Sequence, residues 1–204
     1  MRIGVLGSGN GSNFQAIVDA IESGQLKDVE VALVLSDVAN AKILERARQH
    51  KIPAKYIAPG QFKTKLEPEI EDAYIQALKE AEVDWVVLAG FMRVIKSKML
   101  HAFPYQIVNI HPSLLPAFRG LEAWKQALDY GAKVTGCTVH IVNMDIDGGP
   151  IILQGVVPIE DHDTPETLHQ RIHKMEHTLY PQALQLLAED KVTLRGRRII
   201  RKAS

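Results

Sequence analysis

Strand patterns and helix patterns alternate along almost the whole chain, and this alternation limits the fold more than any other feature. Short apolar runs predict buried strands, and apolar residues spaced by three and four predict helices. Such alternation favours an α/β fold with a doubly wound, mainly parallel sheet and helices on both faces. The expected strands are 2–6, 29–35, 54–57, 85–88, 106–110, 134–142 and 151–157, and the expected helices are 13–22, 41–50, 66–81, 122–130 and a long one from 164.

Three local signals refine the prediction for the C-terminal half of the chain. The strands 134–142 and 151–157 are joined by a short link, so we expect them to be antiparallel. Thr164 and Pro165 have the residue types of a helix N-cap and a first helical position. Pro181 removes one backbone hydrogen bond, which predicts a kink or the end of the helix near Tyr180.

Composition excludes several classes of protein. The 204 residues are enough for one substantial domain, 1–204, which ends in a basic segment from about 194 to 204. Lysine plus arginine and aspartate plus glutamate both number 24, so no global charge attracts nucleic acid or a membrane surface. The single cysteine, Cys137, excludes a disulfide scaffold, and we expect it to be buried. With no signal peptide or long apolar run, the expected location is cytoplasmic.

A glycine-rich loop, Gly7-Ser-Gly-Asn-Gly-Ser-Asn13, follows the first strand and opens a helix. Three glycines allow close approach of the backbone to a ligand, and a helix N-terminus offers free N–H groups, which together favour a phosphate. The spacing matches neither a P-loop nor the dinucleotide fingerprint. Ser12 and Gln15 have capping-box spacing. A tight turn without a ligand is the alternative, and Asp37 after the second strand keeps an NAD-dependent dehydrogenase open.

A second group of polar residues lies near the end of the fifth strand. In Val-Asn109-Ile-His111-Pro, the asparagine and the histidine point to one side of the strand. An amide and an imidazolium can both stabilise a developing oxyanion, and a nearby carboxylate would orient the histidine. Asp147, in Asp147-Gly-Gly-Pro, is the candidate acid. On spacing alone, structural roles for all three residues are an equal alternative.

Other histidines have simpler explanations. His169, His173 and His177 repeat every four residues on the last helix, a spacing that can hold a metal ion. They flank an apolar stripe, so a partly solvated helix face is the simpler interpretation. His140 alternates onto one face of its strand, which favours a structural or supporting role.

The motifs together resemble those of the glycinamide ribonucleotide formyltransferases of de novo purine biosynthesis. The segments that carry the resemblance are VNIHPSLLP at 108–116, DGGP at 147–150 and GNGSN at 9–13, and it extends from Met1 to about Val192. The resemblance implies a Rossmann-like formyltransferase fold. It also implies transfer of a formyl group from the co-substrate 10-formyltetrahydrofolate to the amine of glycinamide ribonucleotide, without a metal.

The resemblance also implies roles for individual residues. Asn109, His111 and Asp147 would be catalytic. The ribonucleotide would bind Gly11, Ser12, Asn13, His173, Lys174, Met175 and Glu176. The folate would bind Met92, Arg93, Val94, Ile95, Asn109, Asn143, Met144, Asp145, Ile146 and Asp147, with Lys65 near its glutamate tail where some members have arginine.

Several rival functions stay open. Methionyl-tRNA formyltransferase shares Ser-Leu-Leu-Pro but would need a second, tRNA-binding domain. A formyltetrahydrofolate hydrolase uses a similar trio with water as acceptor, and usually has an extra N-terminal domain. A dehydrogenase and a non-catalytic binding module complete the alternatives. We expect small-molecule substrates only, with no nucleic acid or membrane partner, and a monomer or homodimer. The basic C-terminal segment is expected to be a solvated strand or tail, with nucleic-acid binding as its alternative.

Overall fold

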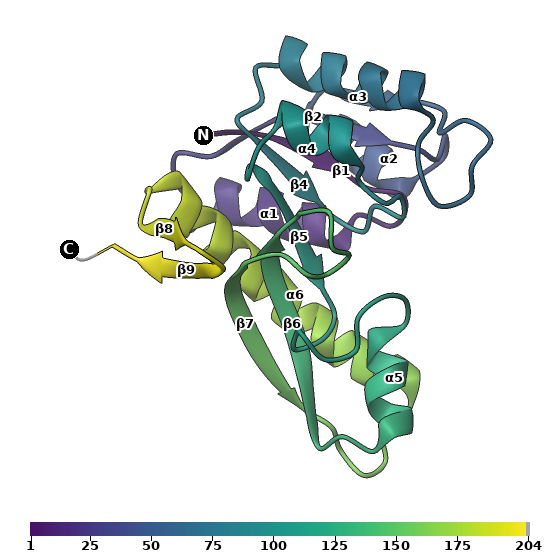
Figure 1. Cartoon of the computed structure of the whole chain (residues 1–204), viewed down its shortest axis with the longest axis vertical. Coiled ribbons are helices and arrows are strands. Elements are labelled where there is room, and N and C mark those ends of the chain that lie inside the picture. Colours follow the sequence, from purple (N-terminus) through teal and green to yellow (C-terminus); the bar gives the residue numbers. More distant parts are fainter. Residues whose placement is uncertain (203–204) are drawn as a thin grey trace. The chain divides into compact units, whose positions relative to one another are not determined.

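The computed structural model of the protein describes residues 1–202 (Figure 1). Its internal contacts divide the chain into two compact units, Met1–Asn109 and Ile110–Ser204. In hydrogen-bonded order, seven strands form the sheet β3-β2-β1-β4-β5-β6-β7, and β8 pairs with β9 separately. The predicted doubly wound, mainly parallel α/β fold is confirmed. Within the described part of the chain, no helix combines the length and the apolar character needed to cross a bilayer.

The first unit is a parallel sheet with helical crossovers. Neighbouring strands pair in parallel in the order β3-β2-β1-β4-β5, and their apolar side chains fill the core. Because parallel crossovers are right-handed, the reversal of strand order at β1 sends α1 and α2 to one face and α3 and α4 to the other. The elements are β1 (Arg2–Leu6), α1 (Ser12–Glu22), β2 (Glu30–Ser36), α2 (Lys42–Gln49), β3 (Ala54–Tyr56), α3 (Pro68–Glu80), β4 (Trp85–Leu88), α4 (Ser97–Ala102) and β5 (Ile107–His111).

The second unit is built around an antiparallel pair of strands and a long helix. β6 and β7 pair over eight residues each, as expected, and α6 packs against both of them. α5 packs against β6 and α6. The elements are α5 (Ala123–Tyr130), β6 (Val134–Ile141), β7 (Ile151–Pro158), α6 (Pro165–Ala188), β8 (Val192–Arg195) and β9 (Arg198–Arg201).

Two expectations about helix ends are wrong. Of the kink or helix end expected near Tyr180, the helix end is wrong, because α6 continues through Pro181 to Ala188. Residues on both sides of the proline are buried, including Leu179 and Leu184, so packing of the helix outweighs one lost backbone bond. At α1, Gly11 is the N-cap and no side chain caps the helix, so Ser12 and Gln15 do not form a capping box.

The start of α6 is fixed as predicted, and more firmly than the sequence indicated. Thr164 is the N-cap, and its side chain forms a reciprocal capping box with Thr167. The preceding Asp163 accepts two hydrogen bonds from Arg171, at 2.6 and 2.9 Å, and one from the Thr167 hydroxyl at 2.9 Å. These contacts, with the Arg171 hydrogen bonds contributing most, lower the pKa of Asp163 to about 2.

Replacing Asp163 with alanine should therefore destabilise the protein. Loss of the charge-assisted contacts with Arg171 is expected to cost about 2 kcal/mol and to lower Tm by roughly 4–8 °C. Thermal unfolding followed by circular dichroism measures this change. Asp161→Ala is the control, because the Asp161–Lys133 pair is almost fully exposed and should contribute little. Equal Tm values for the two variants would show that the Asp163 contacts do not stabilise α6.

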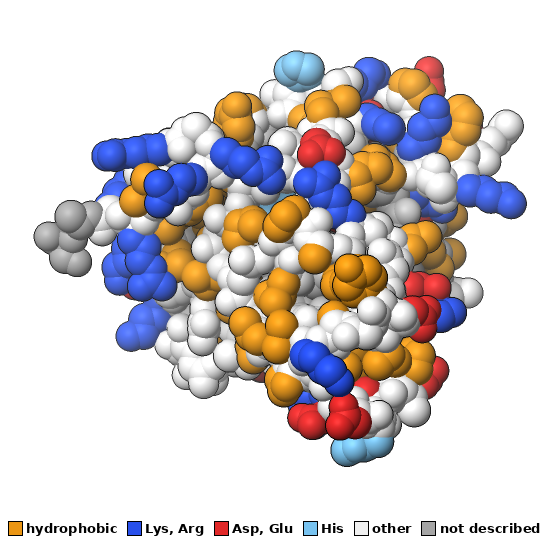
Figure 2. Space-filling model, turned by 60° about the horizontal axis from the view of Figure 1, so that its bottom comes forward, with side chains coloured by type: hydrophobic (Ala, Val, Ile, Leu, Met, Phe, Trp, Pro, Cys, Tyr) orange, Lys and Arg blue, Asp and Glu red, His pale blue; other side chains and the backbone are white. Residues whose placement is uncertain are grey.

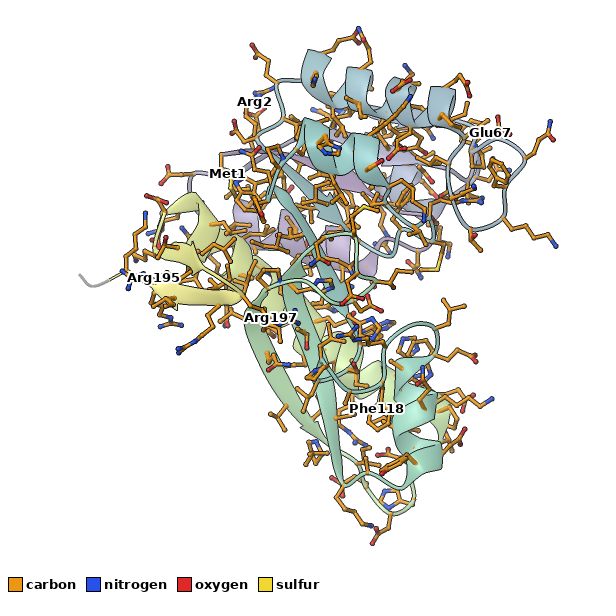
Figure 3. All side chains as sticks on the ribbon, in the orientation of Figure 1. Met1, Arg2, Glu67, Phe118, Arg195 and Arg197 are labelled. Carbon is orange, nitrogen blue, oxygen red and sulfur yellow. The ribbon has the colours of Figure 1, made fainter. Side chains whose placement is uncertain are left out.

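The basic C-terminal segment forms a β-hairpin, β8–β9, rather than a disordered tail. Arg195 pairs with Arg198 across it, and Arg197 lies in the exposed turn (Figure 3). Figure 2 shows lysine and arginine side chains gathered at the end of the molecule that carries this hairpin. Two of its flanking lysines are paired, Lys202 with Asp190 and Lys191 with Glu189. The expectation of a solvated terminal strand is confirmed for residues 192–202.

Candidate active site

The glycine loop turns sharply from β1 into α1. Gly7 donates its N–H to Leu35 at 3.1 Å, so the loop starts as a continuation of the sheet. Gly11 has a φ of 73°, and a Cβ there would lie 2.9 Å from the Cα of Ile43. Only glycine meets both demands without strain. No side chain caps α1, and the first amides of a helix have no partner within the helix, which is a geometry that suits an anion.

Arg46, on α2, holds the middle of this loop. Its guanidinium donates to the carbonyl and side-chain oxygens of Asn10, both at 2.9 Å, and to Gln15 at 3.1 Å. Sequence reasoning missed Arg46 because nothing in its helical pattern indicates a partner 36 residues earlier. The contact leaves a cation beside the loop, which favours an anionic ligand there.

The segment after β4 is tied to the glycine loop and to the loop before α3. The Met92 N–H donates to the Ser8 hydroxyl at 2.8 Å, and the Val94 N–H donates to Thr64 at 2.8 Å. Lys65 forms a parallel bridge with Val94. Ile95 is buried, whereas Met92 is 61% exposed, so this segment presents an apolar side chain to its surroundings.

Arg93, in the segment after β4, forms an ion pair with Asp37. Arg93 Nε donates to the Asp37 carboxylate at 2.7 Å; the Asp37 side chain is buried, and that of Arg93 is 14% exposed. The structure thus gives Asp37 a protein partner, which removes the reason for placing a ribose there. Lys65, expected near a folate tail, has its ammonium 4.1 Å from the centre of the Phe62 ring.

His111 and Asp147 lie side by side in the second unit. His111 Nδ1 is 3.5 Å from Asp147 Oδ2, and the two side chains are 6% and 11% exposed. His111 Nε2 donates to the Phe118 carbonyl at 2.9 Å (Figure 3 labels Phe118). A carbonyl can only accept, so both ring nitrogens of His111 face oxygen acceptors. Asn109 lies two residues earlier on β5 and is half-buried.

The carboxylate of Asp147 is contacted by the loop between β5 and α5 and by β6. Asp147 Oδ2 accepts the Gly120 N–H at 2.9 Å, and the other oxygen is 3.9 Å from His140 Nε2. Asp147 has a φ of 51°, an uncommon value outside glycine. Burial lowers the pKa of His140, which is therefore neutral at pH 7. His140 thus has the supporting position that its strand alternation predicted.

The loop that follows His111 is fixed by hydrogen bonds to β6 and β7. The Thr138 hydroxyl donates to Ser113 at 2.7 Å and accepts the Leu115 N–H at 3.0 Å. Gln154 donates to the Leu115 carbonyl at 2.9 Å. The Leu115–Pro116 peptide bond is cis. This loop leads to Phe118, so its fixed course sets where the His111 partner lies.

The predicted folate wall at 143–147 is a tight turn. Asn143 Oδ1 accepts the Asp145 N–H at 3.1 Å, and the Gly148 N–H donates to the Asp145 carbonyl at 2.8 Å. Met144 and Ile146 are 65% and 56% exposed, so two apolar side chains project from the turn. Asp145 pairs instead with Arg119 at 3.2 Å.

The four predicted ribonucleotide contacts on α6 do not share one environment. Glu176 is buried, and its carboxylate is 3.9 Å from His173 Nε2. Lys174 is exposed on another side of the helix. Met175 packs on β7, where a Cβ added to Gly155 would meet its sulfur at 2.7 Å. His173 and Glu176 are therefore the pair that can act together on a ligand.

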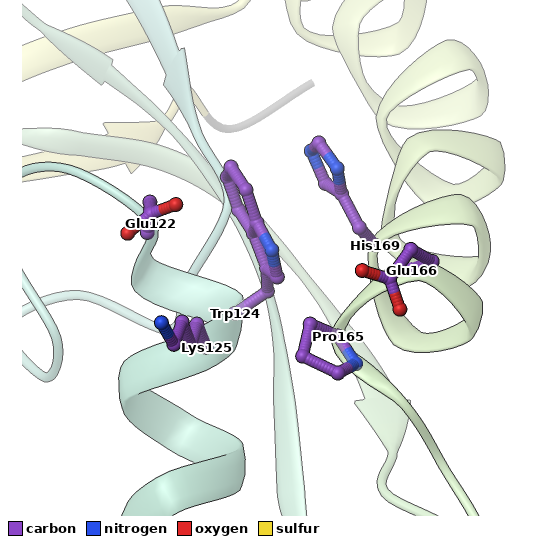
Figure 4. A pocket seen from close by; sticks show the side chains of 6 residues that line it. All are labelled: Glu122, Trp124, Lys125, Pro165, Glu166 and His169. Atoms are coloured by element: carbon purple, nitrogen blue, oxygen red, sulfur yellow. The ribbon is translucent and has the colours of Figure 1, made fainter.

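The histidine stripe of α6 stacks on a tryptophan of α5. The Trp124 and His169 rings are parallel, with centroids 3.6 Å apart, and His173 follows His169 at 4.0 Å. A pocket of about 280 Å³ adjoins the stack (Figure 4). None of the predicted site residues lines it; its walls are Glu122, Trp124, Lys125, Pro165, Glu166 and His169. In residues 1–202, no three or more His, Cys, Asp and Glu side chains are grouped so as to hold a metal ion.

The histidine stripe of α6 should make the protein less stable at acidic pH. Burial, followed by the neighbouring His169 and His177, lowers the pKa of His173 to about 4, and burial also lowers that of His169. The unfolded chain binds these protons near pH 6.5, so stability falls as the pH drops from about 6.5 towards 4. When the pH is lowered from 7.5 to 5, the Tm of the His173→Asn variant should fall by less than the Tm of the wild type.

Thermal unfolding at several pH values tests this expectation. His162→Asn is the control, because His162 is exposed and lies in the turn before α6. The control should keep the wild-type dependence on pH. An equally steep loss of Tm in the His173 variant would contradict the assignment of acid sensitivity to the stripe.

Cys137 is fully buried in β6, as the sequence predicted. Burial, with a smaller effect of Glu176, raises the pKa of its thiol to about 12. A thiol with such a pKa supplies almost no thiolate at neutral pH. Cys137 is therefore a packing residue and not a nucleophile.

Comparisons with known proteins agree with this arrangement. A family model described as formyl transferase matches residues 1–184. Phosphoribosylglycinamide formyltransferase of Bacillus subtilis (strain 168) is 45% identical over 186 residues, which cover 91% of this chain and 94% of that protein. The human trifunctional purine biosynthetic protein adenosine-3 is 41% identical over 193 residues, 95% of this chain and 19% of that protein.

A solved structure is similarly close. The crystal structure of glycinamide ribonucleotide transformylase 1 from Symbiobacterium toebii has a TM-score of 0.94 and 48% sequence identity, and the match covers 98% of this chain and 93% of that one. The family model includes the glycine loop, β5, the Asp147 turn and most of α6. The chain therefore belongs to the formyl transferase family.

Proposed function

We propose that the protein transfers the formyl group of 10-formyltetrahydrofolate to the amine of glycinamide ribonucleotide in de novo purine biosynthesis. The observation that carries this proposal is the buried His111–Asp147 pair, 3.5 Å apart, in a member of the formyl transferase family. The names of the relatives supply the ribonucleotide acceptor and the formyl transfer, whereas the formyl-folate donor is taken from the resemblance of the sequence motifs. Ser113 lies two residues after His111, but its hydroxyl donates to the Ala117 carbonyl at 2.6 Å, and Cys137 is buried. Neither side chain is placed as a nucleophile, which favours direct transfer over an acyl-enzyme.

In this mechanism the substrate amine attacks the formyl carbon and a tetrahedral oxyanion forms. The Asn109 amide donates a hydrogen bond to this oxygen, and the protonated His111 ring donates to it with the Nδ1–H, whose 3.5 Å separation from Asp147 is long for a hydrogen bond. Asp147 orients His111 and balances its charge. When the intermediate collapses, the bond from carbon to the folate nitrogen breaks, and the proton lost by the amine passes to that nitrogen, directly or through a water. The products are formylated ribonucleotide and tetrahydrofolate.

Binding residues are proposed from the same combination of geometry and family. Gly11, Ser12 and Asn13 would hold the phosphate, because the uncapped N-terminus of α1 provides the donors. His173 and Glu176 would contact the sugar, with Lys174 and Met175 completing that turn of the helix. The folate would lie against residues 92–95 and against the Asn143–Asp147 turn, whose exposed Met144 and Ile146 favour an aromatic ligand.

Arg93 and Lys65 would contribute less directly to folate binding. The guanidinium of Arg93 is engaged with protein atoms, so its main chain would meet the ligand. Lys65 would approach the glutamate tail as a single point charge. We further propose that the two compact units form one catalytic domain, 1–204, in a cytoplasmic monomer or homodimer without a metal. The family match across both units supports the single domain.

The first experiment measures the absorbance of 10-formyltetrahydrofolate mixed with the protein, with and without glycinamide ribonucleotide. We expect loss of the formyl-folate only when the ribonucleotide is present. Loss without the ribonucleotide would identify a hydrolase instead. If the folded protein changes neither mixture, the proposal fails, and binding of NAD would then test the dehydrogenase alternative.

A further inference from the structure

The buried guanidinium of Arg93 joins three separate segments of the first unit. Its Nε donates to Asp37, the first residue after β2, at 2.7 Å. Its Nη1 donates to the carbonyl oxygens of Phe62 and Lys63, at 2.6 and 2.5 Å, in the loop before α3. The side chains of Arg93 and Asp37 are 14% and 2% exposed. One cation thus fixes the segment after β4 to the 62–65 loop and to the end of β2.

Main-chain contacts tighten the same junction. Val94 donates to Thr64 at 2.8 Å and also forms a parallel bridge with Lys65. The 62–65 loop and residues 92–95 are therefore joined by main-chain contacts as well as by the guanidinium of Arg93. Met92 donates to Ser8 in the glycine loop at 2.8 Å. The position of residues 92–95 therefore depends on Arg93, which lies at their centre.

The other carboxylate oxygen of Asp37, Oδ1, adds no further contact. It is buried and has no hydrogen-bond partner among the described residues. The charge of Asp37 is close enough to Tyr74 to add to the effect of burial in raising the pKa of that phenol. Such a buried ion pair adds little net stability, whereas it fixes the orientation of both side chains strongly. Its effect is thus to hold Arg93 where the guanidinium reaches the loop carbonyls.

We propose that Asp37 is a positioning residue for the folate co-substrate. Through Arg93 it holds residues 92–95 and the 62–65 loop in the single arrangement that the folate meets. The inference rests on the proposed function, which assigns these two segments to folate binding. Asp37 itself does not touch substrate; its removal frees Arg93 and lets both segments move.

The test compares Asp37→Ala and Asp37→Asn with Glu30→Ala. Glu30 begins β2 and pairs with Arg2 at 2.9 Å in an exposed position, so it is a matched acid at the opposite end of the same strand. We expect Asp37→Ala to raise KM for 10-formyltetrahydrofolate by about tenfold, with KM for glycinamide ribonucleotide changed by less than about twofold. Asp37→Asn keeps an acceptor for Nε and should have a smaller effect. Glu30→Ala should match the wild type.

A second measurement does not depend on activity. Trypsin cleaves after Lys63 and Lys65, so the rate of cleavage there reports how firmly the loop is held. Both Asp37 variants should be cleaved faster than the wild type and Glu30→Ala. The double variant Asp37→Ala/Arg93→Ala should be no faster than Arg93→Ala alone, because Asp37 acts through Arg93.

The outcomes separate this inference from the proposed function. Equal increases in both KM values, or an unchanged rate of cleavage, would overturn the role of Asp37 in a protein that still transfers formyl groups. A wild type without formyl transfer would overturn the proposed function and the folate role with it, and the cleavage rates would then show only whether the three segments are held together. If both Asp37 variants fail to fold while Glu30→Ala folds, Asp37 determines the fold and is not a positioning residue.

Discussion

Replacing His111 with alanine is expected to lower kcat for formyl transfer by about 10³-fold. The proposed mechanism uses the ring of His111 as a donor to the oxyanion, which exists only after the amine has attacked. Such an interaction stabilises the transition state and not the bound substrates, so both KM values should stay within about threefold of the wild type. Steady-state kinetics with each substrate varied in turn measure the two effects.

His101→Ala is the control for the His111 variant. His101 is exposed on α4, where its ring bonds the Ser97 carbonyl of its own helix. The control should keep wild-type kinetics, and circular dichroism should show both variants folded. A folded His111→Ala protein with a kcat within about threefold of the wild type would remove His111 from the mechanism.

Replacing Asp147 with asparagine is expected to lower kcat by about 10²-fold. The change preserves the size of the side chain but removes the negative charge that faces His111 Nδ1 at 3.5 Å. The single amide oxygen of the new asparagine must also accept the Gly120 N–H, which Asp147 Oδ2 now accepts at 2.9 Å, because the NH2 group cannot accept a hydrogen bond. His111 would then lack both the charge that balances an imidazolium and the group that orients its ring.

Asp129→Asn is the matched control, since Asp129 is an exposed acid on α5 in the same unit. The kcat values of the two variants, measured at one pH with both substrates saturating, should differ by about 10²-fold. An Asp147→Asn enzyme as active as the control would make Asp147 a residue of the turn only. The sequence pattern DGGP allows that role, so this comparison decides between the two interpretations.

The seven strands of the main sheet are predictable from the sequence, but α4 and the β8–β9 hairpin are not. Buried apolar runs such as 2–6 and 85–88 were predicted with their observed ends because every residue follows one pattern. α4, Ser97–Ala102, was missed because its six residues bury only Met99, too little for a helical period to appear. The β8–β9 hairpin was read as a strand or tail because its alternation is weak and its arginines obscure it.

The candidate site was predicted in its residue types but not in its partners. The spacing of His111 and the Asp147 turn allowed a pair, and the structure brings the two side chains together. The contact of His111 with Phe118 is not predictable from the sequence, because Phe118 has a φ of 52°, a conformation that an aromatic residue rarely adopts. Arg93 is expected to line a folate site, and only the structure shows that its guanidinium donates to Asp37.

The stacking of Trp124 on His169 makes the fluorescence of Trp124 a natural reporter of the contact between α5 and α6. The chain has two tryptophans, Trp85 in β4 of the first unit and Trp124 in α5 of the second. An imidazole held parallel to an indole at 3.6 Å is placed to quench its fluorescence, most strongly when the imidazole is protonated. Separation of α5 from α6 would therefore brighten Trp124 and leave Trp85 unchanged. Each unit carries a natural fluorophore, so the opening of the second unit can be watched in the unlabelled protein.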